Sequence, residues 1–175
     1  MIGQRQDEAR SGLVTTGRYA VLTMDGLGLL IPQHQVHALE PGVDVQRSQG
    51  DGADWIAVGG APSPVYCLSA DLKPIREVPA GRHICVLLDI GPRLFGVLCD
   101  QVVMLDQAGL DIPPLQGCMR TPGTPLHGLV LQGEQVMCVT SADDLLACMG
   151  QQGVDAPEWS PDESAQPRLL QQEAL

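Results

Sequence analysis

Aromatic and basic residues are scarce in this chain of 175 residues. It contains two Trp, two Tyr and one Phe, and its 10 Lys and Arg face 21 Asp and Glu, for a formal net charge of −11. Binding to nucleic acid needs clustered cations for the phosphates and aromatic rings for stacking, and anionic membrane surfaces attract basic segments. The composition therefore predicts neither nucleic acid nor a membrane surface as a partner.

Long apolar runs are also missing. No stretch approaches the roughly 18–20 apolar residues that a membrane-spanning helix requires. Segment 1–10 alternates polar and charged residues and lacks the apolar stretch of a secretion signal. We therefore expect a cytoplasmic protein with no direct membrane insertion.

The six cysteines form no Cys-x-x-Cys pair, the spacing that zinc knuckles and thioredoxin-like motifs use. Most lie among aliphatic residues, as Cys85 does between Ile84 and Val86, where a reduced thiol packs as a small apolar side chain. His34 and His37 are three residues apart, but no third His or Cys stands at a spacing that would complete a metal site. We predict no metal and no other cofactor.

Sequence motifs for catalysis are missing as well. The sequence has no GxxxxGK[ST] phosphate loop and no GxSxG nucleophile elbow. The Gly26-Leu27-Gly28 stretch lacks the third glycine of a dinucleotide-binding loop, so a hairpin turn is the better interpretation. We predict that the protein is not an enzyme and has no catalytic residues. A cysteine nucleophile with a distant histidine base is the enzymatic alternative.

Glycine and proline are abundant, at 20 and 14 residues, and hydrophobic residues make up 44% of the chain. Without a repeating period, this composition favours short strands joined by tight turns, and hence an all-β fold. The apolar segments and turn residues predict four hairpins, at 19–24 with 29–31, 55–58 with 64–68, 83–89 with 94–105, and 128–131 with 135–140. Their turns are predicted at Asp25-Gly26, Gly59-Gly60, Gly91-Pro92 and Gln132-Gly133.

The segments between the hairpins differ in character. Pro32 is expected to open a single helical turn that carries Val36 and Leu39 on one face. Segments 40–54 and 106–126 are expected to be long surface connections.

One helix is clearly marked at its start. Ser141 can cap it, Asp144 completes a capping box, and Gly150 is placed to end it. Segment 151–175 is rich in Gln, Pro, Asp and Glu, which predicts a disordered acidic tail.

The chain also contains an internal repeat. Residues 19–30 laid on 84–95 match at four positions, among them Gly26 with Gly91, and one further residue of shift pairs Val36 with Val102 and Leu39 with Leu105. Later, residues 65–68 fall on 136–139. Two similar β units of this size would each have a marginal core, so we expect them to pack together and share one. The units are predicted at approximately 17–80 and 81–150, two small pseudo-symmetric barrels within one domain, 17–150.

The order of these motifs resembles the CheW-like family, the adaptors of bacterial chemosensory arrays. The resemblance covers roughly residues 17–149 and rests on Tyr19-Ala20-Val21-Leu22, Gly28 to Pro32, Val36 to Leu39, Pro64 to Leu68, Gly96 to Val102, Pro113-Pro114, Gly128-Leu129-Val130 and Asp143 to Leu146. It implies two five-stranded barrels around a shared core. It also implies a non-enzymatic scaffold that links the chemoreceptor cytoplasmic tip to the regulatory domain of a CheA-type histidine kinase, in chemotaxis or pilus-based motility.

The resemblance also implies which residues contact the partners. Val36, His37 and Leu39 match the segment that the family uses against the kinase. The receptor cleft between the barrels would be lined near Val97, Cys99 and Val102.

The chain departs from the family pattern before the central strand. The family has Asn-Leu-Arg-Gly there, and this chain has Ala61, Pro62, Ser63 and Pro64, so the arginine tied to partner contacts is missing. Ser63 and Pro64 stand at the positions of that arginine and glycine, and they are included for this reason among the predicted partner-binding residues. The departure suggests a second hypothesis: a divergent β-barrel binding module that has lost receptor coupling and binds a small ligand or acts as a decoy.

Overall fold

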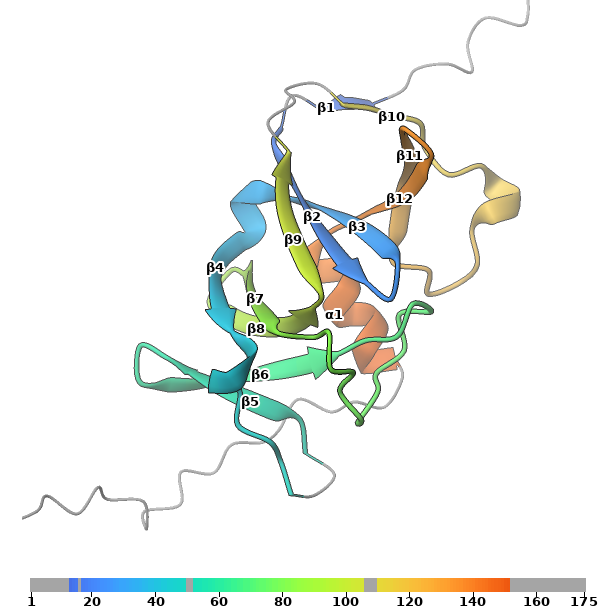
Figure 1. Ribbon diagram of the computed structural model, residues 1–175. Helices are drawn as coiled ribbons and strands as arrows, with labels where there is room; N and C mark the ends of the chain where they lie inside the picture. Colours follow the sequence, from blue (N-terminus) through green and yellow to red (C-terminus); the bar gives the residue numbers. More distant parts are fainter. Residues whose placement is uncertain (1–12, 16, 50–51, 106–109, 152–175) are drawn as a thin grey trace, which may run out of the picture.

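The predicted hairpins assemble into two five-stranded sheets in the computed structural model, which describes residues 13–15, 17–49, 52–105 and 110–151 (Figure 1). Sheet 1 contains, in spatial order, β11 (Leu126–Gln132), β12 (Gln135–Thr140), β3 (Leu27–Pro32), β2 (Tyr19–Met24) and β9 (Gln101–Leu105). Sheet 2 contains β4 (Val36–Pro41), β7 (Ile84–Ile90), β8 (Arg93–Cys99), β6 (Ala61–Cys67) and β5 (Asp54–Val58). A small third sheet pairs β1 (Leu13–Thr15) with β10 (Leu110–Ile112).

The two large sheets have equivalent topologies. β3 runs parallel to β12 in sheet 1, β8 runs parallel to β6 in sheet 2, and every other neighbouring pair in both sheets is antiparallel. The counterparts are therefore β2 and β7, β3 and β8, β9 and β4, β12 and β6, and β11 and β5. This confirms the prediction of an all-β fold with two pseudo-symmetric five-stranded units.

The prediction that each unit is a continuous half of the chain is wrong. The strand pairing crosses the proposed boundary between 17–80 and 81–150, because β2 and β3 lie in sheet 1 whereas β4, β5 and β6 lie in sheet 2. Each sheet takes its hairpin from one repeat and its other three strands from the other repeat. The two repeats are therefore intertwined through an exchange of hairpins.

The repeat is also displaced by one residue within the hairpins. The β2–β3 turn has positive φ at both Asp25 (48°) and Gly26 (82°), as a type I′ turn requires, whereas the β7–β8 turn has it at its first residue, Gly91 (73°). Asp25, and not Gly26, is thus the counterpart of Gly91. The same offset, which also relates Val36 to Val102, places Leu22 and Leu88 together in the central core.

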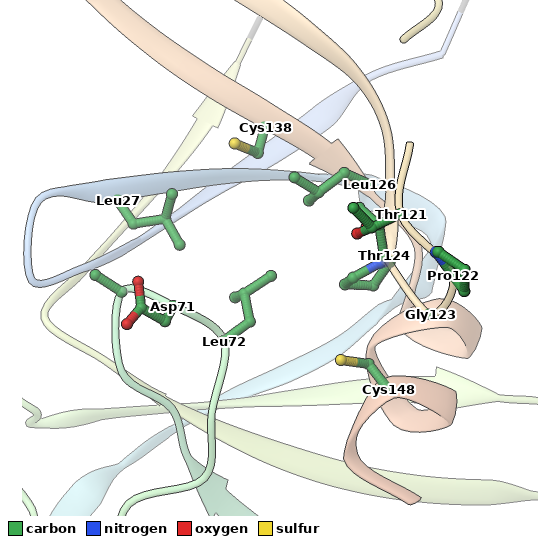
Figure 2. Close-up of a pocket in the computed structure, with 12 residues that line it drawn as sticks. Leu27, Asp71, Leu72, Thr121, Pro122, Gly123, Thr124, Leu126, Cys138 and Cys148 are labelled. Carbon is green, nitrogen blue, oxygen red and sulfur yellow. The ribbon is translucent and has the colours of Figure 1, made fainter. Parts of the chain in front are cut away.

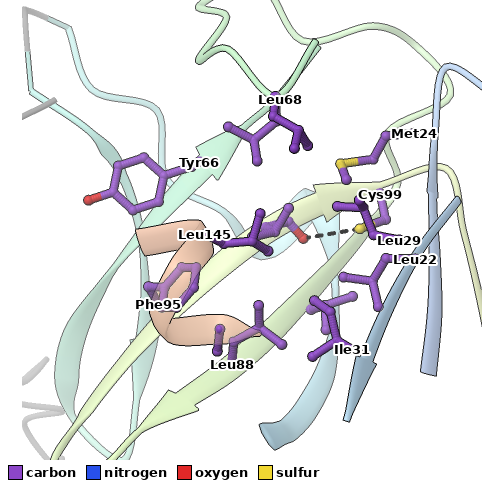
Figure 3. Packing of buried hydrophobic residues seen from close by; sticks show 14 of the residues in the cluster. Leu22, Met24, Leu29, Ile31, Tyr66, Leu68, Leu88, Phe95, Cys99 and Leu145 are labelled. Atoms are coloured by element: carbon purple, nitrogen blue, oxygen red, sulfur yellow. Dashed lines mark hydrogen bonds between the residues drawn. The ribbon is translucent and has the colours of Figure 1, made fainter. Parts of the chain in front are cut away.

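The core has three parts because each sheet buries both of its faces. The central cluster lies between the sheets and against α1 (Figure 3). The other face of sheet 1 covers a second cluster with β10, and the other face of sheet 2 covers a third. Within the central cluster, the rings of Tyr66 and Phe95 meet edge to face with centroids 6.3 Å apart. The shared core expected from the repeat is therefore present.

Three predicted connections contain more structure than expected. Val36 and Leu39 do not lie on a helical turn: a 3-10 turn, η1 (Gln33–Gln35), precedes β4, where inward and outward side chains alternate as in a strand. Segment 40–54 includes η2 (Gly42–Asp44), and the described part of 106–126 includes β10 and η3 (Gly117–Met119). Long irregular segments gain order here by pairing with sheet edges, as Gln46 does with Trp55.

The helix α1 (Ala142–Gln151) begins after Ser141, as predicted, and ends one residue beyond Gly150. The Ser141 hydroxyl accepts a hydrogen bond from the Asp144 amide at 3.2 Å, which is the expected N-cap. The predicted acidic tail lies outside the described residues. Within the part of the chain that is described, no helix is both long and apolar enough to span a membrane.

Candidate partner-binding surface

The eight residues predicted to contact partners differ widely in accessibility. His37 and Leu39 are exposed on β4. Val36, Pro64 and Val102 are half-buried. Ser63, Val97 and Cys99 are buried. The structure therefore does not bring the eight side chains together on one accessible surface.

Val97 and Cys99 belong to the central core and have no exposed surface. Figure 3 shows Cys99 within this cluster. The Cys99 thiol donates a weak hydrogen bond to the Val97 carbonyl oxygen, 3.6 Å away. Ser63 points to the interior from β6. No partner can reach these three side chains while the fold is intact, so we correct the prediction and remove them from the candidate surface. β8, which carries Val97 and Cys99, is apolar on both faces, so the alternation of its side chains does not indicate from the sequence which of them are accessible.

β4 forms one edge of sheet 2 and presents the two exposed candidates. Among the described strands it pairs only with β7, with an irregularity in register between Val36 and Ala38. Val36 packs against the central core, whereas Leu39 keeps 46% of its surface exposed. An unpaired strand edge with an exposed apolar side chain is a suitable surface for a protein partner.

β9, the counterpart of β4, forms the matching edge of sheet 1 and was missed at the sequence level. Val103 and Met104 on β9 are 43% and 42% exposed, and no residue of this strand is charged. The repeat contained the signal, because the offset that relates Val36 to Val102 also relates His37 to Val103. The sequence predicts one strand at 94–105, whereas in the structure the chain passes from sheet 2 to sheet 1 at Asp100.

The start of β4 is held against α1 by Gln35. The Gln35 side-chain carbonyl accepts a hydrogen bond from the Ala142 amide at 3.0 Å, and its amide group donates to Asp143 at 3.4 Å. The amide of Ala142 belongs to the first turn of the helix, where backbone donors have no partner within the helix. The orientation of the β4 edge therefore depends on the N-terminus of α1.

The two sheets are joined by a buried cation, Arg82. Its side chain has no exposed surface and donates to Asp25 at 2.8 Å and to the carbonyl oxygens of Leu68 and Leu98 at 2.8 and 3.1 Å. Its Nε lies 3.3 Å from Asp100 without a hydrogen bond. Asp100 also accepts the Asp25 amide at 2.8 Å. Because Asp25 lies in the β2–β3 turn and Leu98 in β8, this network fixes the hairpin of sheet 1 to sheet 2.

Four of the cysteines are held as thiols by their surroundings. Burial raises the pKa of Cys85 to about 12, and burial is also the main cause that raises the pKa of Cys67, Cys99 and Cys138. A thiol with a raised pKa is a weak nucleophile at neutral pH. Among the described residues, no group of three or more His, Cys, Asp or Glu could hold a metal ion, and His34 and His37 have no further ligand beside them.

Comparison with known proteins yields a match in structure and none in sequence. No protein-family model matches the chain, and a search of curated proteins finds no significant match. Among solved structures, the fold is similar to the scaffolding protein TtCheW from Thermoanaerobacter tengcongensis, with a TM-score of 0.55 and 12% sequence identity. The match covers 72% of this chain and 89% of that one. The chain therefore has a CheW-like fold.

Proposed function

We propose that the protein is a non-enzymatic adaptor in a bacterial chemosensory system, acting in the cytoplasm to link receptors to a CheA-type histidine kinase. The observation that carries the proposal is the CheW-like fold, since one solved structure with a similar fold is a scaffolding protein. The raised pKa values of the buried Cys85 and Cys99 thiols disfavour these two cysteines as nucleophiles, which supports a binding role.

An adaptor needs at least two binding surfaces, and the pseudo-symmetry supplies two equivalent ones. The β4 edge carries His37 and Leu39, and the β9 edge carries Val103 and Met104. The two strands occupy equivalent places in different sheets, so each edge is a separate candidate site for a partner. We assign the β4 edge to the regulatory domain of the kinase, since the matching segment serves that purpose in the family that this sequence resembles, and the β9 edge to the chemoreceptor cytoplasmic tip.

The assignment of Pro64 and Val102 remains part of the proposal. Pro64 is half-buried in β6 and pairs with Trp55, whose side chain is exposed. Val102 is half-buried at the start of β9. Both are expected to support the adjoining exposed side chains and to contact a partner only at its margin.

The proposal is tested by measuring binding of the purified protein to the regulatory domain of its cognate kinase by calorimetry. We expect a complex that buries on the order of 1,200–2,000 Å². Leu39→Asp should weaken it about ten-fold or more, because an exposed apolar contact becomes a charge that must be desolvated. Leu131→Asp, on the exposed part of β11, is the matched control and should bind as the parent does.

Two results would count against the proposal. The adaptor role is rejected if the parent protein binds neither the kinase domain nor a receptor tip. The assignment of the kinase to β4 is rejected if Met104→Asp weakens kinase binding and Leu39→Asp does not.

A further inference from the structure

A cavity of about 360 Å³ lies at the end of the second core cluster, next to the residue that caps α1. Most of its lining is apolar and is provided by Tyr19, Pro32, Ile112, Pro114 and Val139. None of the described residues that line it belongs to β4 or β9, so it is separate from the two edges assigned to partners above. Ligand pockets are typically apolar clefts of about 300–1,000 Å³, and the mouth of a small barrel is a common place for them.

A second hollow, of about 400 Å³, lies at the C-terminal end of α1 and differs in character. It is open to solvent, with Asp71 on one side and Thr121 and Thr124 on the other (Figure 2). Polar groups that lie apart in an open hollow do not select one kind of molecule. The cavity beside Ser141 is therefore the better candidate for a ligand site.

The side chains of this cavity that can carry a charge are both basic. Arg120 and His127 line it, whereas none of the nine described residues of the lining is Asp or Glu. This is unexpected in a chain with 10 Lys and Arg against 21 Asp and Glu. Among the described residues, no carboxylate forms an ion pair with Arg120. Its guanidinium is therefore free to pair with an anionic ligand, and a carboxylate can accept two parallel hydrogen bonds from such a group.

His127 owes its place in the wall to an irregularity in β11. The register of β11 on β12 shifts between Leu126 and Gly128, so His127 has no opposite residue in β12. Bulges of this kind redirect a side chain and are common beside functional sites. The Asp144 carboxylate, which does not belong to the lining, lies 2.7 Å from Nε2 of His127 and holds the ring by a hydrogen bond. The ring is thereby a fixed part of the wall.

The segment that carries Arg120 is attached to the wall on both sides. Before it, the Leu115 amide donates a hydrogen bond to the His127 carbonyl oxygen at 3.2 Å. After it, the Thr140 hydroxyl donates to the Pro125 carbonyl oxygen at 2.6 Å. Because these two bonds fix the segment to β11 and β12, the fold itself sets the place of the basic side chain beside the apolar wall.

We propose that the cavity binds a small organic carboxylate, whose apolar body contacts Ile112 and Val139 and whose carboxylate pairs with Arg120. The volume lies near the lower end of the range for ligand pockets, so we expect a compact occupant such as an aromatic monocarboxylate. This site goes beyond the adaptor role proposed above and does not depend on it.

Titration of the full chain with benzoate at constant ionic strength, followed by NMR of the backbone amides, tests the proposal. We expect saturable shifts at Ile112, Val139 and Ser141, and none in β5, which forms the far edge of sheet 2. Benzamide has the same ring without the charge. It should bind about ten-fold more weakly than benzoate, because a hydrogen bond between charged groups contributes more than one to a neutral group.

Two variants separate the effect of the charge from that of the cavity. Arg120→Met should weaken benzoate binding about ten-fold and leave benzamide binding unchanged. Arg93→Met, at the exposed start of β8, is the matched control and should bind both probes as the parent does. Pro114→Phe places a ring at an exposed position of the lining and should abolish the shifts from both probes. Thermal unfolding of each variant verifies that the fold is intact.

The proposal is overturned if benzoate gives no saturable shift at the amides of the cavity up to its solubility limit. Equal benzoate binding by the parent and by Arg120→Met would also overturn it, as would benzamide binding as tight as that of benzoate. If Pro114→Phe leaves the shifts unchanged, benzoate binds elsewhere on the protein and the assignment to this cavity is wrong.

Discussion

Arg82 is the residue on which the relative placement of the two sheets depends most directly. In place of water, its guanidinium is surrounded by two carboxylates and two carbonyl oxygens, which come from both sheets. A buried charge is tolerated only when it is paired and hydrogen-bonded in this way.

Replacing Arg82 with Met is expected to lower the free energy of unfolding by about 3 kcal/mol, because two carbonyl oxygens and two carboxylates lose their partner. Asp25 and Asp100 remain partly exposed, so water limits the loss. Urea denaturation measures the change. Arg93→Met, at the exposed start of β8, is the control and should change stability by less than about 0.5 kcal/mol.

The ionisation of Asp144, in the first turn of α1, makes the stability of the protein depend on pH. Burial alone would raise the pKa of its carboxyl, but hydrogen bonds from Ser141 and His127 outweigh this and hold the pKa below 3.8. A carboxyl with a lowered pKa in the folded state stabilises the protein above its ordinary pKa. That contribution disappears as the pH falls through the folded pKa.

Asp144→Asn should therefore destabilise the protein at pH 7 by about 0.5 kcal/mol, a small value because the carboxylate is 43% exposed and screened by water. The difference from the parent should shrink as the pH falls below 3.8. Thermal unfolding at a series of pH values measures this, with Asp111→Asn in β10 as the control. A difference that stays constant down to pH 2 would show that Asp144 acts by packing alone.

At the scale of elements, β11 comes so close to the end of β10 at residue 128 that only glycine, which has no Cβ, fits at this position. A Cβ on Gly128 would lie 2.6 Å from the Ile112 side chain and 2.8 Å from the carbonyl oxygen of Pro113. The backbone carbonyl cannot rotate away as a flexible side chain could. This contact sets how β10 covers the second core cluster.

We expect Gly128→Ala to lower the melting temperature, with a loss of about 1–3 kcal/mol from overpacking. Gly117→Ala in η3 is the matched control, because a Cβ there meets no atom within 4 Å and φ is not positive. Differential scanning calorimetry of the two variants gives the comparison. Equal melting temperatures would mean that β10 moves away from β11 without cost.

The strands were predictable because each hairpin combines apolar segments with turn residues of restricted conformation, such as Asp25-Gly26. β4 was not, since Val36 and Leu39 are three apart and fit a helical turn as well as a strand. Pairing with β7 decides between these two in the structure. The exposed edge at Val103 and Met104 was hidden for a similar reason: accessibility there depends on which sheet β9 joins, and that is a long-range property.

At the scale of the whole molecule, the exchange of hairpins makes each repeat incomplete on its own. Residues 17–80 contain β2 to β6, which belong to two different sheets, and residues 81–151 contain the rest of both. Neither piece can bury the central cluster by itself, because Leu22 and Leu88 come from different repeats.

A protease site inserted between the exposed residues Arg76 and Glu77 tests this. After cleavage we expect the two fragments to stay associated under native conditions and to unfold together. Separated in denaturant, each alone should lack a cooperative unfolding transition, and mixing should restore it. A cooperative transition in either isolated fragment, followed by circular dichroism, would contradict the intertwined arrangement.

The crossing of the chain between the sheets also bears on how such a molecule arises. A single ancestral unit of this kind would finish its sheet only by lending its hairpin to a second copy of itself. Two copies that had exchanged hairpins in this way, once fused end to end, would yield the strand order seen here. Fusion would also free the two edges, β4 and β9, to diverge in sequence, so that an assembly that began with two identical faces ends with two different ones.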